Sequence, residues 1–136
     1  MPDQRTRTDR VLTKEEQESL TPKQVLTLLV DGNTRFVAGD ITHRDHQAQV
    51  RAAAQGQWPK GVVLSCVDSR IPVEDVFDCG IGDLFVARVA GNIINQDILG
   101  SMEFACAVSG AKLVLVLGHE HSGALKGATD RVEMGN

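Results

Sequence analysis

The chain has 136 residues, of which 42% are hydrophobic and 24% charged, and 14 Lys and Arg against 18 Asp and Glu give a net charge of −4. These values are typical of one globular domain and argue against a nucleic-acid-binding surface. No stretch approaches the roughly 20 apolar residues of a membrane span, and the polar start lacks the apolar segment of a secretory signal. We therefore expect a cytoplasmic protein with neither a membrane nor a nucleic-acid partner.

The first twenty residues are charged and rich in Thr and Gln, which predicts a peripheral arm over residues 1–20 and a single domain over residues 21–136. Thr21, Pro22 and Gln24 then supply an N-cap, a proline at the first helical position and the partner residue of a capping box. Apolar residues at helical spacing follow, so an amphipathic helix is expected to begin here.

From residue 61 onward, short apolar runs alternate with turn and helix signals. The runs cover residues 62–64, 84–87 and 113–117 and are typical of buried strands. Helical spacing over residues 95–109, ended by Gly110, predicts a crossover helix between the last two runs. Because a strand, a crossover helix and a second strand form a parallel pair, we expect an α/β fold with a parallel sheet flanked by helices.

Two of these runs are followed by residues that can bind a metal. In an open parallel sheet, ligands bind beyond the carboxyl ends of the strands, and Cys66 follows the first run while His119 follows the third. A thiolate and a neutral imidazole are typical zinc ligands, and Asp68 can add a carboxylate that Arg70 would face. Taken singly, a cysteine such as Cys66 is more often a buried apolar thiol, and a histidine such as His119 more often has a structural role. An Asp and an Arg two residues apart are more often an ordinary surface ion pair. Together they indicate a zinc site.

Three segments carry a resemblance to a known family: SCVDSR over residues 65–70, GIGDLFVARVAGN over residues 80–92, and GNTRFV over residues 32–37. They resemble the first zinc-ligand motif, the central strand and turn, and the N-terminal helix of the β-class carbonic anhydrases. The resemblance extends over residues 21–130, which is most of the chain. It implies the fold of that family, with a zinc cofactor.

The resemblance implies that Cys66 and His119 hold zinc beside a catalytic pair formed by Asp68 and Arg70. While bound to Arg70, Asp68 would accept a hydrogen bond from a zinc-bound water; turned inward, it would occupy the fourth metal position. Zinc lowers the pKa of bound water to about 7, so that zinc-bound hydroxide hydrates carbon dioxide reversibly to bicarbonate. By the same resemblance, we expect a homodimer or a higher homo-oligomer.

The resemblance also implies a substrate pocket. Val89 and the turn formed by Ala90 and Gly91 would supply its apolar side, because small residues leave room for a linear substrate. Ordinary strand and turn packing is the alternative role for these three residues.

The sequence departs from the family at Ser122, where the second motif has a cysteine three residues after the histidine. A neutral hydroxyl binds zinc much more weakly than a thiolate does. Three alternatives remain for the third ligand. Asp68 can serve permanently, although it would then take the water position; His121 can replace the thiolate; or Ser122 can bind weakly through its oxygen. His119 and His121 point to opposite faces if the strand extends through them, and converge only if the backbone turns between them.

The chain is also shorter at its C-terminus than the family, whose members usually continue through a further strand and helices. Three strands would leave an exposed sheet edge unless a partner covers it. The missing thiolate and the short C-terminus support an alternative function, that of a non-catalytic carbonic anhydrase-like protein with weakened or absent zinc binding.

Overall fold

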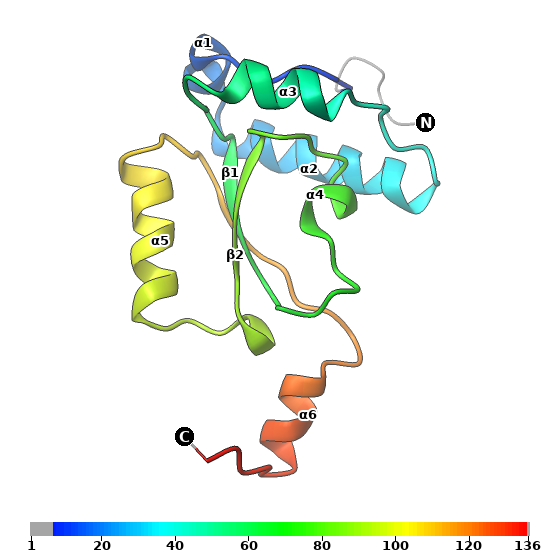
Figure 1. Cartoon of the computed structure of the whole chain (residues 1–136), viewed down its shortest axis with the longest axis vertical. Coiled ribbons are helices and arrows are strands. Elements are labelled where there is room, and N and C mark those ends of the chain that lie inside the picture. The colour runs from blue at the N-terminus through cyan, green and yellow to red at the C-terminus, as the bar shows by residue number, and fades with distance from the viewer. Residues whose placement is uncertain (1–6, 136) are drawn as a thin grey trace.

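The structure is a computed structural model that describes residues 7–135 (Figure 1). None of the helices within these residues is long and apolar enough to cross a membrane. The elements, in chain order, are α1 (Lys14–Ser19), α2 (Pro22–Val37), α3 (His46–Ala53), β1 (Gly61–Ser65), α4 (Val73–Val76), β2 (Leu84–Arg88), the 3₁₀ turn η2 (Ala90–Asn92), α5 (Gln96–Ala107), β3 (Val114–Val116) and α6 (Gly123–Thr129).

The three strands form a parallel sheet with β1 in the middle, in the order β2-β1-β3. Val62 of β1 pairs with Phe85 of β2 and with Val114 of β3. Because the strands are parallel, their carboxyl ends lie at one edge of the sheet, where Figure 1 shows η2 and α6. The predicted α/β fold with a parallel sheet is confirmed.

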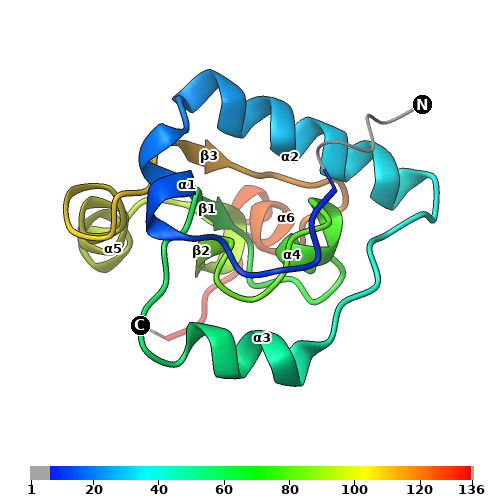
Figure 2. The same ribbon diagram turned by 90° about the horizontal axis from the view of Figure 1, so that it is seen from above.

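Helices cover both faces of the sheet, with α5 on one side and α4 on the other (Figure 2). Successive residues of β1 point to opposite faces. Val63 belongs to the core shared with α2 and α4, whereas Val62 and Leu64 belong to the core shared with α5. β1 is therefore buried along its whole length, and the residue that follows it is held by packing on both sides.

The N-terminal segment is attached to the domain over α1 and the residue that follows it. Gln17 is buried, and its amide Nε2 donates to the carbonyls of Pro59 and Ser109 at 2.7 Å each. Leu20 packs against the core formed with α2 and α4. Residues 1–6 of the predicted arm lie outside the described residues.

The helix predicted from Thr21 is confirmed as α2, and its capping box is present. Gly32 lets this helix approach the end of α4 closely, because a Cβ at this position would lie 1.9 Å from the carbonyl oxygen of Phe77. Beside it, Nδ2 of Asn33 donates to the carbonyl of Val76 at 2.9 Å. The GNTRFV segment thus fixes α2 against the chain that leaves β1.

The third strand is less buried than its apolar run predicts. Leu113, Leu115 and Leu117 pack against the core of α2 and α4, whereas Val114 and Val116 are 44% and 59% exposed. The prediction of a buried strand is therefore wrong for the alternate residues. The reason is that α5 lies against β1 and β2, and no other helix of residues 7–135 covers this face of β3.

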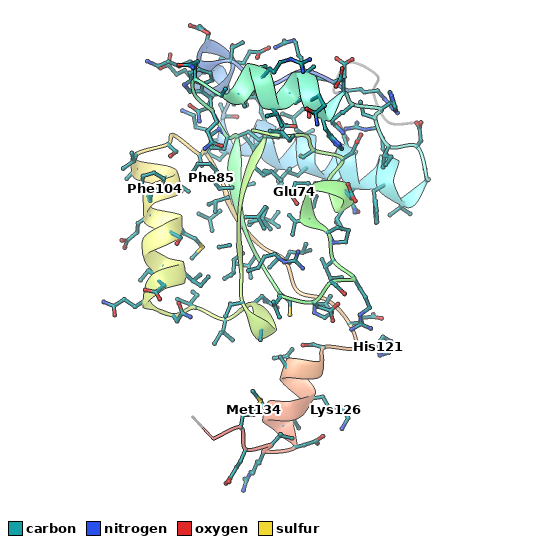
Figure 3. The ribbon with its side chains drawn as sticks, in the orientation of Figure 1. Glu74, Phe85, Phe104, His121, Lys126 and Met134 are labelled. Carbon is teal, nitrogen blue, oxygen red and sulfur yellow. The ribbon has the colours of Figure 1, made fainter. Side chains whose placement is uncertain are left out.

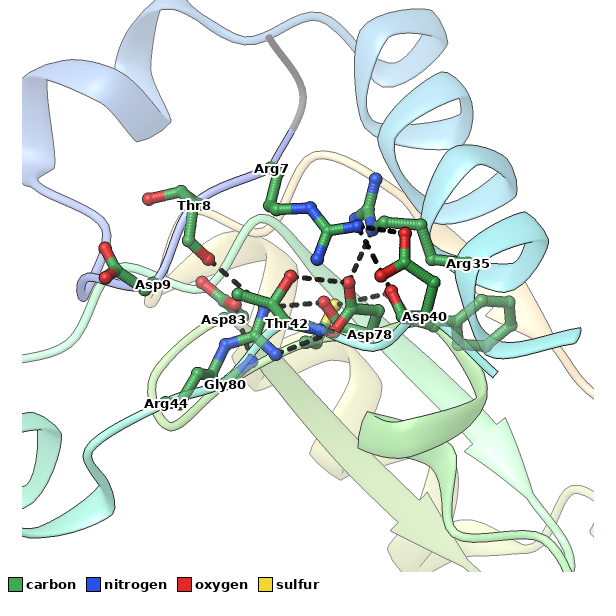
Figure 4. A network of polar contacts seen from close by, with 12 residues as sticks. Arg7, Thr8, Asp9, Arg35, Asp40, Thr42, Arg44, Asp78, Gly80 and Asp83 are labelled. Atoms are coloured by element: carbon green, nitrogen blue, oxygen red, sulfur yellow. Dashed lines mark hydrogen bonds and ion pairs between the residues drawn. The ribbon is translucent and has the colours of Figure 1, made fainter. Parts of the chain in front are cut away.

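Asp78, which closely follows α4, is the centre of a buried ionic network (Figure 4). The side chains of Arg35 and Arg44 bind its two oxygens at 2.5 and 2.8 Å, and Thr42 donates to it through its backbone N–H and its hydroxyl. Burial alone would raise the pKa of Asp78, but the hydrogen bonds from Arg35 and Arg44 outweigh it and lower the pKa to about 2. The network joins α2, the chain before α3 and the chain after α4.

We expect Asp78→Asn to lower the free energy of unfolding by about 3 kcal/mol at neutral pH, because two buried guanidinium groups lose their anion. Since the folded pKa of Asp78 is lowered, its contribution is complete above the ordinary pKa of 3.8 and is lost as the pH falls toward 2. Urea unfolding across this pH range measures both effects. Glu103→Gln, which removes an exposed carboxylate of α5, is the control, and equal losses in the two variants would contradict the prediction.

Candidate functional site

Cys66 follows β1 directly and lies at the carboxyl edge of the sheet. Its side chain is buried, and the backbone N–H of Gly91 donates to Sγ at 3.3 Å. Gly91 belongs to η2, which follows β2, and its φ of +75° is one that glycine adopts without a Cβ clash. The thiol is therefore enclosed between the ends of two adjacent strands.

His119 reaches the same place from the chain after β3, with a side chain that is only 6% exposed. Its Nδ1 lies 2.8 Å from the carbonyl of Glu120. Because a carbonyl can only accept, Nδ1 carries a proton, and in the neutral ring Nε2 then has the free lone pair. Nε2 is buried without a hydrogen-bond partner and lies 4.0 Å from Oδ2 of Asp68. This tautomer and orientation suit a histidine that binds a metal through Nε2.

The two side chains influence each other's protonation. The neighbouring His119 imidazole, followed by the backbone N–H groups of Asp68 and Gly91, lowers the pKa of the Cys66 thiol to about 7. The interaction with Cys66, followed by the Glu120 carbonyl, raises the pKa of His119. A thiol with a lowered pKa supplies the thiolate form that binds metals.

Asp68 and Arg70 form a closed pair beside Cys66. The guanidinium of Arg70 donates to the Asp68 carboxylate from its Nε at 3.0 Å and from a terminal nitrogen at 2.6 Å. The backbone N–H of Arg70 donates to the same carboxylate at 2.9 Å. These contacts hold the pKa of Asp68 well below its usual range. Arg70 also donates to the carbonyl of His121 at 3.0 Å, so it connects the chain after β1 to the chain after β3.

Ser122 and His121 lie next to His119 but have other surroundings. Ser122 is the N-cap of α6, and its hydroxyl accepts from the backbone N–H of Leu125 at 3.3 Å. His121 is exposed (Figure 3), and its φ of +56° lies in the left-handed region. The backbone therefore turns between His119 and His121, yet the ring of His121 stays at the surface.

The expected substrate-pocket residues have three different environments. Val89 packs against the core shared with α5, Ala90 is exposed, and Gly91 is buried beside the thiol. Gly91 is thus the one of the three that the structure ties to Cys66 by a hydrogen bond.

The donors present fit a zinc ion in part. Cys66 and His119 provide the sulfur and nitrogen that zinc favours, and the buried lone pair of Nε2 has no other partner. Asp68 is close but is engaged by Arg70. Accordingly, no group of three or more His, Cys, Asp and Glu side chains within residues 7–135 is arranged to hold a metal ion.

Comparison with known proteins identifies the family. The family model for carbonic anhydrase matches residues 61–136. A solved structure, the β-carbonic anhydrase CafA of Aspergillus fumigatus, superposes with a TM-score of 0.61 at 29% identity over 66% of this chain and 45% of that chain. This chain belongs to the β-class carbonic anhydrases. The resemblance seen in the sequence motifs is therefore confirmed.

Two further relatives show the extent of the match. The carbonic anhydrase of Mycolicibacterium smegmatis is 44% identical over 108 residues, which cover 79% of this chain. A solved structure of a tetrameric β-carbonic anhydrase from Sordaria macrospora superposes with a TM-score of 0.55 at 26% identity over 79% of this chain and 53% of that chain. This β-class chain spans about half the length of the curated relative, since the match covers 52% of it.

The structure adds Arg88 to the residues around the site. Its guanidinium donates to the carbonyls of Cys66 and Asp68. Arg88 lies within the GIGDLFVARVAGN motif, but no local pattern predicts its role, because nothing local shows that a side chain on one strand reaches the turn that follows the neighbouring strand. A charged residue that ends an otherwise apolar strand is the signal that marks it.

We expect His121→Gly to raise the free energy of unfolding by about 0.5–1 kcal/mol, because glycine adopts a positive φ without a Cβ clash. We also expect it to bind zinc as tightly as the unaltered chain, since the His121 ring is exposed. Urea unfolding and zinc competition with a coloured chelator test both. His121→Ala, which removes the ring and keeps Cβ, is the control; weakened zinc binding in both variants would make His121 a ligand.

Proposed function

We propose that this chain is a zinc-dependent carbonic anhydrase that hydrates carbon dioxide reversibly to bicarbonate. The observation that carries the proposal is the unpartnered, buried Nε2 of His119 beside the Cys66 thiol. A buried polar atom without a partner is costly, and ligation of a metal would satisfy it. The position also supports the proposal, because ligands of parallel sheets bind beyond the carboxyl ends of the strands.

Cys66 and His119 would hold the zinc ion through Sγ and Nε2. Zinc, when bound, supplies the Lewis-acid activation that lets water act as a nucleophile near neutral pH. The Glu120 carbonyl fixes the His119 tautomer with Nε2 free, and the Gly91 N–H fixes the Cys66 sulfur. These two backbone contacts support the orientation of both donors toward a metal ion.

Asp68 would orient the nucleophile. Because Arg70 keeps it ionised, Asp68 can accept a hydrogen bond from the attacking water throughout the neutral pH range. Its Oδ2 lies 4.0 Å from Nε2 of His119, which supports this role beside the proposed metal. Arg70 acts on the water through Asp68 alone, since its own donors are aimed at Asp68 and at the His121 carbonyl.

Carbon dioxide would approach over Val89 and the turn at Gly91. A linear apolar substrate gains from contact with hydrocarbon and needs no dedicated hydrogen bonds. Gly91 presents no side chain of its own beside the thiol.

The third protein ligand is the point on which two functions diverge. Ser122 would contribute only a weak oxygen ligand, and Asp68 would complete the set only by leaving Arg70. The use of the Ser122 hydroxyl as a helix cap favours a second candidate function, a non-catalytic carbonic anhydrase-like protein with weakened or absent zinc binding. Zinc affinity therefore separates the two candidates.

We expect the zinc-supplemented chain to hydrate carbon dioxide faster than its Cys66→Ala variant, because the variant lacks the only thiolate of the proposed site. Stopped-flow measurement with a pH indicator, alongside the zinc content after gel filtration, tests this. Cys106→Ala removes an exposed thiol of α5 and is the control. Equal hydration by the unaltered chain and Cys66→Ala would contradict the proposal and favour the non-catalytic candidate.

We expect Ser122→Cys to tighten zinc binding at least tenfold and to raise the hydration rate, because a thiolate is a far better zinc ligand than a hydroxyl. Chelator competition and stopped-flow hydration measure the two effects. Ser122→Ala loses the same helix cap, which costs about 1 kcal/mol, and adds no ligand. If Ser122→Cys and Ser122→Ala bind zinc equally, position 122 does not face the metal.

We also propose that the chain forms a homodimer through the β2 edge of the sheet. Within residues 7–135, β2 is an edge strand of the sheet, and next to it lies a cleft of about 840 Å³ between β2 and α5. Phe85 and Phe104 stack in this cleft with ring centroids 6.3 Å apart, and Phe104 is 53% exposed (Figure 3). A second copy would cover both the strand edge and the aromatic surface.

We expect Phe104→Glu to convert the dimer to a monomer, because it places a charge in the apolar contact. Sedimentation velocity at micromolar concentration reports the mass. Val30→Glu alters an exposed apolar residue of α2, away from β2, and is the matched control. A dimer that persists in Phe104→Glu, or that is lost equally in both variants, would exclude this surface.

A further inference from the structure

Arg88 is placed beside the metal-binding turn by the register of the sheet. It is the last residue of β2, and parallel pairing sets it opposite Ser65, the last residue of β1. The backbone N–H of the next residue, Val89, donates to the Ser65 carbonyl at 3.1 Å. The side chain of Arg88 therefore starts next to the residue that precedes Cys66.

The guanidinium of Arg88 spans the turn that follows β1. Its Nε donates to the carbonyl of Cys66 at 2.7 Å, and a terminal nitrogen donates to the carbonyl of Asp68 at 2.5 Å. These carbonyls belong to the proposed zinc ligand and to the carboxylate that would orient water. A planar guanidinium can donate to both at once, whereas an ammonium group has no fixed fork that matches two carbonyls.

The other bonds around Asp68 come mainly from within the turn itself. The backbone N–H of Arg70 donates to the Asp68 carboxylate, and that of Ile71 donates to the Asp68 carbonyl. These local bonds shape the turn but do not fix its position relative to β2. Arg88 supplies that connection, with Gly91 from the same segment holding the thiol.

We propose that Arg88 is a positioning residue that holds the Cys66–Asp68 turn in the geometry that binds the metal, an inference that rests on the proposed function. Because Arg88 donates to two backbone carbonyls of this turn, it would act through Cys66 and Asp68. Groups that orient metal ligands typically contribute 10- to 100-fold to metal affinity.

The first experiment needs no metal. Hydrogen exchange measured by mass spectrometry on the metal-free chain compares peptides covering residues 66–71 in the unaltered chain, Arg88→Ala and Arg88→Lys. We expect exchange in this segment to accelerate at least tenfold in Arg88→Ala and less in Arg88→Lys, which can donate to one carbonyl. Arg51→Ala removes an exposed arginine of α3 and is the matched control, with no expected change.

The second experiment uses cobalt as a spectroscopic substitute for zinc. We expect Arg88→Ala to bind Co²⁺ at least tenfold more weakly and to show altered thiolate-to-cobalt and d–d absorption bands. Arg88→Lys should recover part of the affinity without the full spectrum, because charge alone does not reproduce the fork. A merely stabilising residue would lower the unfolding midpoint and leave the bands unchanged.

The outcomes separate the two proposals. If the unaltered chain binds no metal while exchange accelerates in Arg88→Ala, the zinc function fails and the positioning of the turn stands. If the unaltered chain binds Co²⁺ while Arg88→Ala matches it in affinity, spectrum and exchange, the role of Arg88 is overturned. If Arg88→Ala does not fold, Arg88→Lys decides by the same readouts.

Discussion

Parallel pairing of β1 with both of its neighbours is the constraint on which the site depends. Cys66, Gly91 and His119 are far apart in sequence, and each follows a different strand. Because the three strands run in one direction, their ends deliver these residues to one edge of the sheet. Burial of β1 on both faces fixes where the turn after Ser65 begins. Hydrogen bonds then orient the Cys66, His119 and Asp68 side chains at this edge.

Three backbone groups orient the side chains of the proposed site. The Glu120 carbonyl selects the His119 tautomer that leaves Nε2 free, the Gly91 N–H binds the Cys66 sulfur, and the His121 carbonyl receives Arg70. His121, which supplies the last of these carbonyls, is a non-glycine residue in a left-handed conformation. Such a conformation costs free energy, so the contacts around it must compensate. Arg70 contributes to that compensation, because it donates to the His121 carbonyl while it binds Asp68.

The sequence predicted those parts of the structure that local pattern determines. The capping box at Thr21 and the strand runs are local signals, and Cys66 and His119 follow from strand ends together with residue chemistry. The network around Asp78 was not predicted, because Arg35 is 43 positions away and no local pattern joins them. Arg88 was missed for the same reason. Its partners lie on the neighbouring segment, and strand register is visible only in the fold.

Other features depended on competition between local and tertiary effects. An apolar run predicted a buried β3, but burial also requires a covering element, and α5 lies against the other two strands. Ser122 was expected as a weak ligand, and the structure shows its hydroxyl capping α6. A hydroxyl has a second lone pair, so the helix cap does not by itself prevent Ser122 from binding a metal, and the measured zinc affinity decides its role.

The most direct test of the proposed site is X-ray absorption at the zinc edge of the zinc-loaded chain. Ligation by Cys66 and His119 predicts one sulfur at about 2.3 Å, with the remaining neighbours nitrogen and oxygen at about 2.0–2.2 Å. Cys66→Ala should abolish the sulfur shell. A shell without sulfur in the unaltered chain, or one that persists in Cys66→Ala, would contradict the assignment of Cys66 and His119 as the metal donors.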